Sequence, residues 1–362
     1  MIPRSAPALL VGLFLLLGAG ALGGPKLDGR RRTGTGLRLE SITQDSAGLE
    51  IWESVWHDRS RGRDVPVRIL LPAQAEGSAE LRGKTPLLLW SHGLGGTAQS
   101  NRYLLEAWAA AGYAVLAMQH AGSDLAALRS AGLLRLRRRF REVYEDAQAR
   151  EDRRLDVGFV LDELERRAER DPRLRGRIDL ATVGLGGHSF GAFTTMACLG
   201  ASFEGTQPAP GGHPVSRPEP RIQAGIAMSP QGPGSFGFGE DSWGSVQRPF
   251  LSMTGTEDQS FVSGDSSPRR VAFERSTKVQ RIHITLEGAE HHAFGESKLR
   301  GGKERHPSHH PWIVQASLAW WDAQLRGDEA ASSWLKGKSL EKESRGQARV
   351  ELGAAATSAE SR

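Results

Sequence analysis

The most constraining feature of this sequence is the stretch 187–191, which reads Gly-His-Ser-Phe-Gly and fits the pattern Gly-x-Ser-x-Gly. A short apolar run, 181–185, precedes it, and residues 192–199 can continue as a helix. In a strand–turn–helix of this kind the residues two before and two after the serine come close together, and glycine at both positions avoids a clash. A chance match is the alternative in a chain with 44 glycines. The flanking strand and helix favour the strained turn, which projects Ser189 Oγ above the end of a sheet.

The composition is that of a globular protein. Hydrophobic residues make up 38% of the 362 residues and charged residues 25%, and the formal net charge is +5. The basic residues alternate with acidic ones and no nucleic-acid-binding motif accompanies them, so we expect no nucleic-acid partner. Cys198 is the single cysteine. It allows neither an intramolecular disulfide nor a cysteine-based zinc site.

The N-terminus has the pattern of a secretory signal. Residues 1–24 combine Arg4, an apolar core at 8–17 and small residues at 19–21. A membrane anchor is the alternative, but the apolar run is shorter than the ~20 residues that a span needs. We therefore expect a cleaved signal peptide, a secreted or periplasmic protein, and no stable membrane span in the mature chain. Residues 25–47 are predicted to be a flexible lead-in.

Strand-like and helix-like segments alternate along the chain and predict an α/β domain over 48–330. A hairpin at 49–71 is expected at the sheet edge. Alternation of this kind predicts a mainly parallel sheet with helices on both faces. The polar, Ala/Ser-rich residues 336–362 are predicted to be a disordered tail. The expected strands are 86–90, 113–118, 181–185, 222–228, 249–254 and 279–286, and the expected helices are 99–111, 125–149, 151–169, 266–276 and 311–325.

An acid and a base for Ser189 are expected on the loops after two later strands, in the order serine, acid, histidine. The loop after 249–254 offers Asp258 and its neighbour Glu257. The loop after 279–286 offers His291 and its neighbour His292. We select Asp258 and His291, because a four-residue turn that opens at a glycine three positions earlier would bring each of them back toward the sheet.

Two backbone N–H groups are the candidate donors to an oxyanion. Residues 91–97 read Ser-His-Gly-Leu-Gly-Gly-Thr after a buried strand, and glycine-rich backbone leaves N–H groups free to face a ligand. The N–H of Leu94 and the N–H of Phe190, at the start of the helix after Ser189, are the predicted pair.

These motifs together resemble the Ser-dependent α/β-hydrolases of the platelet-activating-factor acetylhydrolase and dienelactone-hydrolase-like group. Residues 91–95 are similar to that group's oxyanion loop, 187–191 to its elbow, and 120–124, which read His-Ala-Gly-Ser-Asp, to its loop after the next strand. The resemblance covers about residues 50–325 and implies the α/β-hydrolase fold. It also implies a catalytic triad of Ser189, Asp258 and His291, with Leu94 and Phe190 lining the oxyanion hole.

The sequence departs from this group in two ways. True dienelactone hydrolases use a cysteine nucleophile, whereas this chain has Ser189. Segments 125–149 and 202–247 have no counterpart, and they are the ones expected to shape the acyl pocket.

The leading hypothesis is a serine carboxylic-ester hydrolase that needs no metal or cofactor and acts on short-acyl lipid or related esters. A polyester or cutin-type hydrolase, an acyltransferase on the same fold and a non-catalytic binding module are the alternatives. His306, His309 and His310 lie close together in sequence, but no acid at ligand spacing accompanies them, so no metal site is predicted.

Overall fold

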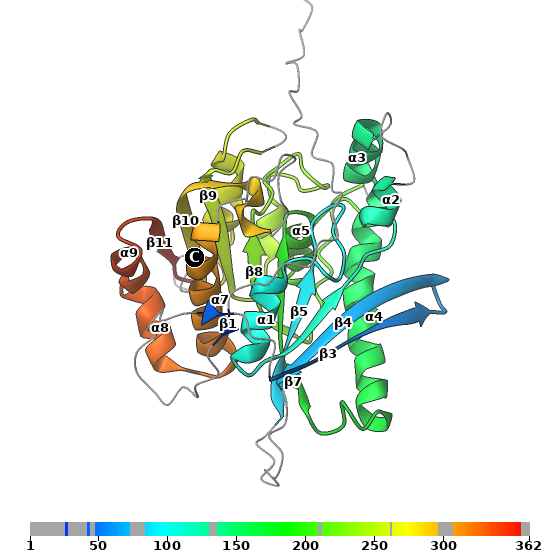
Figure 1. Cartoon of the computed structure of the whole chain (residues 1–362). Coiled ribbons are helices and arrows are strands. Elements are labelled where there is room, and N and C mark those ends of the chain that lie inside the picture. Colours follow the sequence, from blue (N-terminus) through cyan, green and yellow to red (C-terminus); the bar gives the residue numbers. More distant parts are fainter. Residues whose placement is uncertain are drawn as a thin grey trace, which may run out of the picture.

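A nine-stranded sheet forms the centre of the molecule, in the order β11-β10-β9-β8-β7-β5-β6-β4-β3 (Figure 1). The computed structural model describes residues 26–27, 42–43, 48–72, 84–129, 136–208, 212–260, 263–295 and 307–355. The strands are β3 (Leu49–Asp58), β4 (Arg63–Pro72), β5 (Thr85–Ser91), β6 (Ala114–Met118), β7 (Ile178–His188), β8 (Ile222–Met228), β9 (Phe250–Glu257), β10 (Arg281–Glu290) and β11 (Ala348–Gly353).

The sheet is mainly parallel, as the sequence predicts. Six neighbouring strands, from β6 through β5, β7, β8 and β9 to β10, run parallel. The β3–β4 hairpin extends one side of the sheet in antiparallel pairing, and β11 closes the other side against β10. The central strand β5 is fully buried from Leu88 to Trp90, which explains its continuous apolar sequence.

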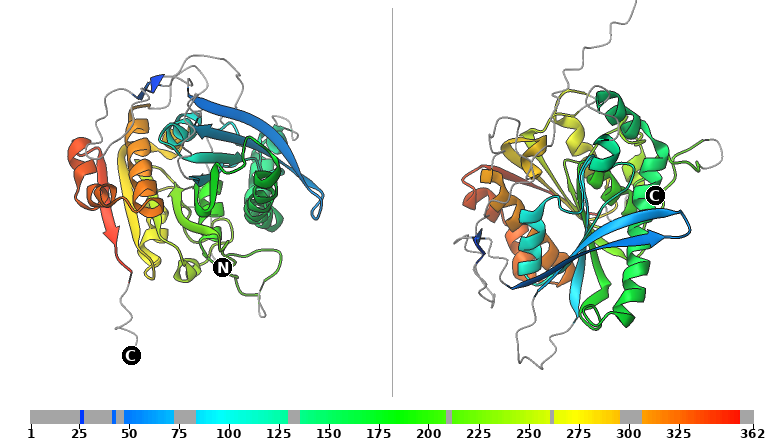
Figure 2. Two further views of the ribbon diagram at one scale, coloured as in Figure 1. Left: turned by 90° about the horizontal axis from the view of Figure 1, so that it is seen from below. Right: turned by 45° about the vertical axis from the view of Figure 1, so that its right-hand side comes forward.

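Helices cover both faces of the sheet (Figure 2). On one face α4 and α5 pack against the sheet, and Val157, Val160 and Phe193 belong to their buried core. On the other face α1 and α7 do the same, with Trp108, Trp320 and others in a second core. The helices are α1 (Arg102–Ala110), α2 (Leu125–Arg129), α3 (Leu136–Glu145), α4 (Ala147–Arg170), α5 (Phe190–Cys198), α6 (Val271–Arg275), α7 (His310–Leu325), α8 (Glu329–Lys336) and α9 (Ser339–Glu343).

The prediction of a disordered tail over 336–362 is wrong for the part that the structure describes. Helix α9 and strand β11 occupy it, and β11 adds a strand to the edge of the sheet at β10. Leu340, Ala348 and Val350 are buried. In β11 the buried Ala348 and Val350 alternate with the charged Arg349 and Glu351, so only one face is buried and the average composition remains polar.

Two other predictions need adjustment. The expected helix 125–149 is divided into α2, α3 and the first turn of α4, which begins after its N-cap Asp146. Asp146 accepts a hydrogen bond from the backbone N–H of Gln148, and a cap of this kind starts a new helix. The expected signal peptide 1–24 lies outside the described residues. Within the expected lead-in 25–47 the structure describes only β1 (Lys26–Leu27) and β2 (Ile42–Thr43), which pair with each other.

The chain reverses its direction of strand addition between β5 and β7. From β5 it proceeds to β6 on one side and then returns to β7 on the other. In open α/β sheets, ligands bind outside the carboxyl ends of the strands at such a switch point. The loops after β5 and β7 carry residues 91–97 and Ser189, so the predicted site residues meet at this position.

Candidate active site

Ser189 lies in a strained turn between β7 and α5. Its backbone has φ 56° and ψ −116°, a conformation that residues with a side chain rarely adopt. A Cβ atom on Gly187 would overlap the backbone of Gly191, and a Cβ atom on Gly191 would overlap the carbonyl group of Ser91 at the end of β5. Glycine is therefore required at both positions, for the reason that the sequence pattern suggests.

Ser189, His291 and Asp258 form a chain of hydrogen bonds. Nε2 of His291 lies 3.0 Å from Ser189 Oγ, and Nδ1 of His291 lies 2.8 Å from Asp258 Oδ1. A carboxylate can only accept, so Nδ1 carries the hydrogen and Nε2 is free to accept the proton of the serine hydroxyl. Arg269 Nη2 also comes within 3.2 Å of Nδ1. Because the Nδ1 hydrogen is directed at the carboxylate, this guanidinium is a neighbouring charge and not a donor to the ring.

The Asp258 carboxylate is buried and fully ionised by its surroundings. Thr254 Oγ1 donates to Asp258 Oδ2 at 2.8 Å, and Arg269 Nε lies 3.2 Å from Oδ1. Burial by itself would raise the pKa of this carboxyl, but the charges of Arg269 and His291 outweigh it and hold the pKa well below its usual range. Asp258 therefore stays an acceptor and keeps His291 in the required tautomer.

Arg269 is a buried residue of this site that sequence reasoning missed. Its Nη1 donates to the carbonyl oxygens of Ser229 and Pro230, both at 3.1 Å, and its Nη2 donates to the carbonyl oxygen of Gln259 at 3.0 Å. These contacts join the loops after β8 and β9 behind the carboxylate of Asp258. Arg269 is one of 47 basic residues, and no motif distinguishes it from the others.

The structure separates the two members of each candidate pair. Glu257 is exposed, whereas its neighbour Asp258 is buried against His291. His292 packs against the edge of the His291 ring, with 5.4 Å between the ring centroids, whereas Nε2 of His291 faces Ser189 Oγ. Nε2 of His188, the residue before the serine, donates to the carbonyl oxygen of His291 at 2.9 Å. His188 thus helps to hold the base, a role that its position within Gly-x-Ser-x-Gly does not indicate.

The glycine-rich loop after β5 packs against the elbow. A Cβ atom on Gly93 would lie 3.4 Å from Ser189 Cβ and 3.3 Å from the carbonyl oxygen of His188. Within the part of the chain that the structure describes, the N–H of the next residue, Leu94, donates to no other group. The N–H of Phe190 is the first of α5, and the first N–H groups of a helix have no partner within it. Both predicted oxyanion donors therefore have an N–H available beside Ser189.

A small cavity lies in front of Ser189. Its volume is about 10 Å³, which is room for about one water molecule. Tyr144 packs on Phe236 with 4.3 Å between ring centroids, and Phe236 stacks on Phe190 at 4.1 Å. Segments 125–149 and 202–247, which the sequence analysis expects to shape the acyl pocket, thus supply part of the cavity wall. The lining residues are Leu94, Phe140, Tyr144, Ser189, Gln231, Ser235, Phe236, Ser260 and Arg269.

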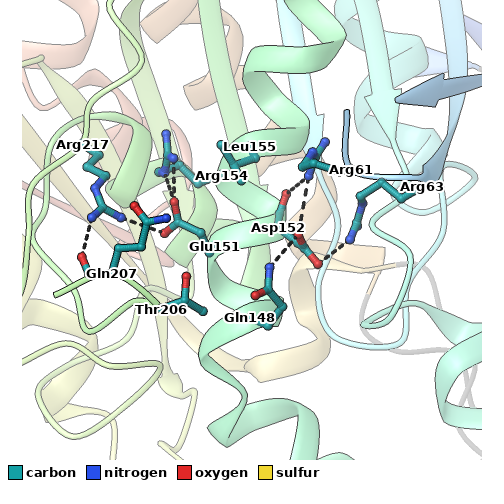
Figure 3. A pocket seen from close by; sticks show the side chains of 10 residues that line it. All are labelled: Arg61, Arg63, Gln148, Glu151, Asp152, Arg154, Leu155, Thr206, Gln207 and Arg217. Carbon is teal, nitrogen blue, oxygen red and sulfur yellow. Dashed lines mark hydrogen bonds and ion pairs between the residues drawn. The ribbon is translucent and has the colours of Figure 1, made fainter. Parts of the chain in front are cut away.

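A larger hollow on α4 shares no lining residue with the cavity at Ser189 (Figure 3). Its volume is about 500 Å³. Its arginines are paired with acids on the same surface: Arg63 with Asp152 at 2.5 Å, and Arg154 with Glu151 at 2.6 Å. The Arg63–Asp152 pair connects α4 to the β3–β4 hairpin, and Arg217, whose Nη1 lies 3.4 Å from Glu151, connects α4 to the 202–220 loop. None of its lining residues belongs to the hydrogen-bonded chain of Ser189, His291 and Asp258.

The histidines near α7 contact backbone carbonyl groups. His309 Nε2 lies 2.9 Å from the carbonyl oxygen of Glu287, and His310 Nε2 lies 3.2 Å from that of Gly295. Among the described residues, no group of three or more His, Cys, Asp or Glu side chains is arranged to hold a metal ion. His306 lies outside them.

The fold and site define an α/β protein with a mainly parallel sheet and a Ser–His–Asp hydrogen-bonded chain at its topological switch point. None of the helices in the described ranges is both long and apolar enough to cross a bilayer. No protein-family model and no curated protein matches the chain.

Proposed function

We propose that this protein is a serine carboxylic-ester hydrolase that acts through an acyl-enzyme on Ser189. The α/β-hydrolase fold and the platelet-activating-factor acetylhydrolase and dienelactone-hydrolase-like group are part of the same proposal. The observation that carries it is the pair of contacts at His291: 3.0 Å from Nε2 to Ser189 Oγ and 2.8 Å from Nδ1 to Asp258. This geometry supports nucleophilic catalysis, because the base reaches the nucleophile and the acid orients the base.

The chemistry follows from these contacts. Ser189 Oγ attacks the ester carbonyl carbon while His291 Nε2 takes its proton, and the N–H groups of Leu94 and Phe190 stabilise the oxyanion. Collapse of the tetrahedral intermediate breaks the bond to the alcohol, which receives the proton from His291. A water molecule then attacks the acyl-enzyme with His291 as base, and Ser189 is released with the carboxylic acid.

The size of the cavity supports a short acyl group. The cavity of about 10 Å³ at Ser189 favours the smallest acyl groups, because a longer chain would have to displace more of the side chains that line it. Acetyl or similarly small acyl esters therefore fit best, and the alcohol portion extends toward solvent.

The decisive experiment compares wild type with Ser189→Ala on p-nitrophenyl acetate, butyrate and octanoate. We expect turnover of the acetate in wild type and loss of essentially all turnover in Ser189→Ala. Ser333→Ala, at an exposed serine on α8, is the matched control and should retain full activity. Full turnover in Ser189→Ala, or no turnover of any ester by wild type, would contradict the proposal. Adding glycerol as acceptor distinguishes hydrolysis from acyl transfer, since both use the same acyl-enzyme.

Secretion or periplasmic export is a separate part of the proposal. It is supported by the pattern of Arg4, the apolar run 8–17 and the small residues 19–21. N-terminal sequencing of exported protein should begin just after Ala21 or Gly23, and retention of Met1 in a cytosolic product would refute it.

A further inference from the structure

Arg153, on α4, is completely buried beneath the loop that carries Leu94. Its exposed fraction is 0%. Burying a guanidinium costs several kcal/mol unless hydrogen bonds and opposite charges compensate for its lost hydration. Its Nη1 donates to the carbonyl oxygen of His92 at 2.6 Å, its Nη2 to that of Gly93 at 3.4 Å, and its Nε to Ser123 Oγ at 2.9 Å. Two of these three acceptors are consecutive carbonyl groups of the glycine-rich loop.

The contact with Gly93 helps to fix where the Leu94 N–H points. The carbonyl of Gly93 and the N–H of Leu94 belong to one planar trans peptide unit, so they point in opposite directions. Holding the carbonyl toward Arg153 therefore directs the N–H away from α4. The opposite side of the loop faces Ser189, because a Cβ on Gly93 would lie 3.4 Å from Ser189 Cβ.

His92 holds the same carbonyl from its own side chain. Its Nε2 accepts the backbone N–H of His120 at 3.0 Å, so Nε2 carries no hydrogen and Nδ1 does. Nδ1 then donates to the carbonyl oxygen of Gly93 at 2.6 Å. Burial, with the charge of Arg153 next, lowers the pKa of His92 well below its usual value, which keeps this neutral tautomer. The carbonyl oxygen of Gly93 thus accepts from three donors, since the backbone N–H of Gly96 also donates to it at 3.0 Å.

Arg153 also contacts the residue that supplies the second oxyanion donor. Its guanidinium carbon lies 4.0 Å from the centroid of the Phe190 ring. A cation at this distance is attracted to the face of an aromatic ring. One buried side chain therefore contacts both the peptide unit that joins Gly93 to Leu94 and the ring of Phe190.

We propose that Arg153 is a positioning residue that keeps the N–H groups of Leu94 and Phe190 directed at the oxyanion during ester hydrolysis. The inference rests on the proposed function and deepens it. If Arg153 had only a structural role, replacing it would destabilise the fold but would weaken binding of the transition state no more than binding of the substrate. A positioning arginine affects the transition state selectively, because only the oxyanion uses these two N–H groups.

The test measures kcat and KM for p-nitrophenyl acetate, and Ki for an alkyl trifluoromethyl ketone, in Arg153→Met and Arg153→Lys. Addition of Ser189 to the ketone forms an O–C bond, converts the carbonyl to an oxyanion and passes the serine proton to His291, so Ki reports on the oxyanion site. The matched control is Arg154→Met. Arg154 is the next residue of α4 and pairs with Glu151 in the wall of the hollow on α4 (Figure 3).

We expect kcat to fall about 10²-fold in Arg153→Met, as after loss of one oxyanion donor, with KM nearly unchanged and Ki raised in parallel. Arg153→Lys should lose about 10-fold in kcat, because an ammonium group lacks the planar fork that binds two carbonyls. If Arg153→Met does not fold, Arg153→Lys decides by the same criteria. The inference is overturned, with an active wild type, if Arg153→Met leaves kcat unchanged or raises only KM. An equal loss of kcat in Arg154→Met would overturn it as well. A wild type that neither hydrolyses the ester nor binds the ketone refutes the proposed function itself, and the inference with it.

Discussion

Under the proposed function, replacing Tyr144 should allow the protein to accept longer acyl chains. Tyr144 lies on α3, packs on Phe236 at 4.3 Å between ring centroids and shares a hydrogen bond with the Ser235 side chain. It lines the cavity of about 10 Å³ in front of Ser189. An acyl chain longer than acetyl has to displace this ring. Tyr144→Ala removes the ring and opens the cavity toward α3.

The expected magnitude follows from burial of the added methylene groups. Each buried CH₂ contributes about 0.8 kcal/mol, which corresponds to a factor of about four in kcat/KM. Butyrate has two more methylene groups than acetate, so the butyrate-to-acetate ratio of kcat/KM should rise about 15-fold in Tyr144→Ala. Because Tyr144 is only half-buried, the stability loss should be smaller than the 3–5 kcal/mol typical of a fully buried aromatic side chain.

The assay is kcat/KM for p-nitrophenyl acetate, propionate, butyrate and hexanoate. Tyr103→Ala is the matched control, since Tyr103 is also half-buried but stacks on His310 away from the cavity. Its chain-length profile should match that of wild type. An unchanged profile in Tyr144→Ala, or a wild type that prefers hexanoate to acetate, would refute the reasoning.

Three further predictions test other parts of the structure. His291→Ala should reduce ester turnover on the order of 10³-fold or more, and His292→Ala far less. Buried His92 is neutral in the folded protein and takes up a proton on unfolding below pH about 6.5. The contribution of neutral, buried His92 to the unfolding free energy is therefore present above that pH, and about 2 kcal/mol of unfolding free energy is lost by pH 5. Removing residues 346–362 strips β11 from β10 and should lower the unfolding free energy by about 3 kcal/mol.

Each of these predictions has its own control. An inactive His292→Ala beside an active His291→Ala would contradict the assignment of the base. For the pH effect, urea unfolding gives the unfolding free energy at pH 7.5 and at pH 5.0. The difference between the two values should be smaller in His92→Gln than in His213→Gln, where the histidine is exposed, and equal differences would contradict the prediction. A chain lacking only 356–362 should unfold like wild type. If the longer truncation also leaves the urea midpoint unchanged, β11 does not stabilise the sheet.

The sequence predicts the parallel sheet and the meeting of Ser189, Asp258 and His291 because these depend on local patterns. The turn expected at Gly255 is present, since the N–H of Asp258 donates to the carbonyl oxygen of Gly255 at 3.2 Å. The corresponding reason for choosing His291, a four-residue turn that opens at Gly288, is wrong. Strand β10 continues through Gly288, which has φ 67°, to Glu290, and His291 begins a short 3-10 turn. The His291 side chain still reaches Ser189, because strand β10 continues beyond the apolar segment 279–286 as far as Glu290.

The two buried arginines of the site could not be predicted from sequence. Arg153 stands beside another arginine on a helix rich in charge, and Arg269 beside another arginine in a turn. Only the packing of α4 under the loop after β5, and of the loops after β8 and β9 behind Asp258, distinguishes them from surface residues. The ordered tail was missed for a related reason, because an edge strand with one buried face has a polar average composition.

The central claim is tested most directly by locating the site of covalent modification. The protein is treated with a fluorophosphonate, digested and mapped by mass spectrometry, with Ser189→Ala and His291→Ala in parallel. We expect one adduct, on Ser189, that is absent from Ser189→Ala and forms far more slowly in His291→Ala. An adduct on another residue, or complete loss of ester turnover while Ser189 remains unmodified, would contradict the account.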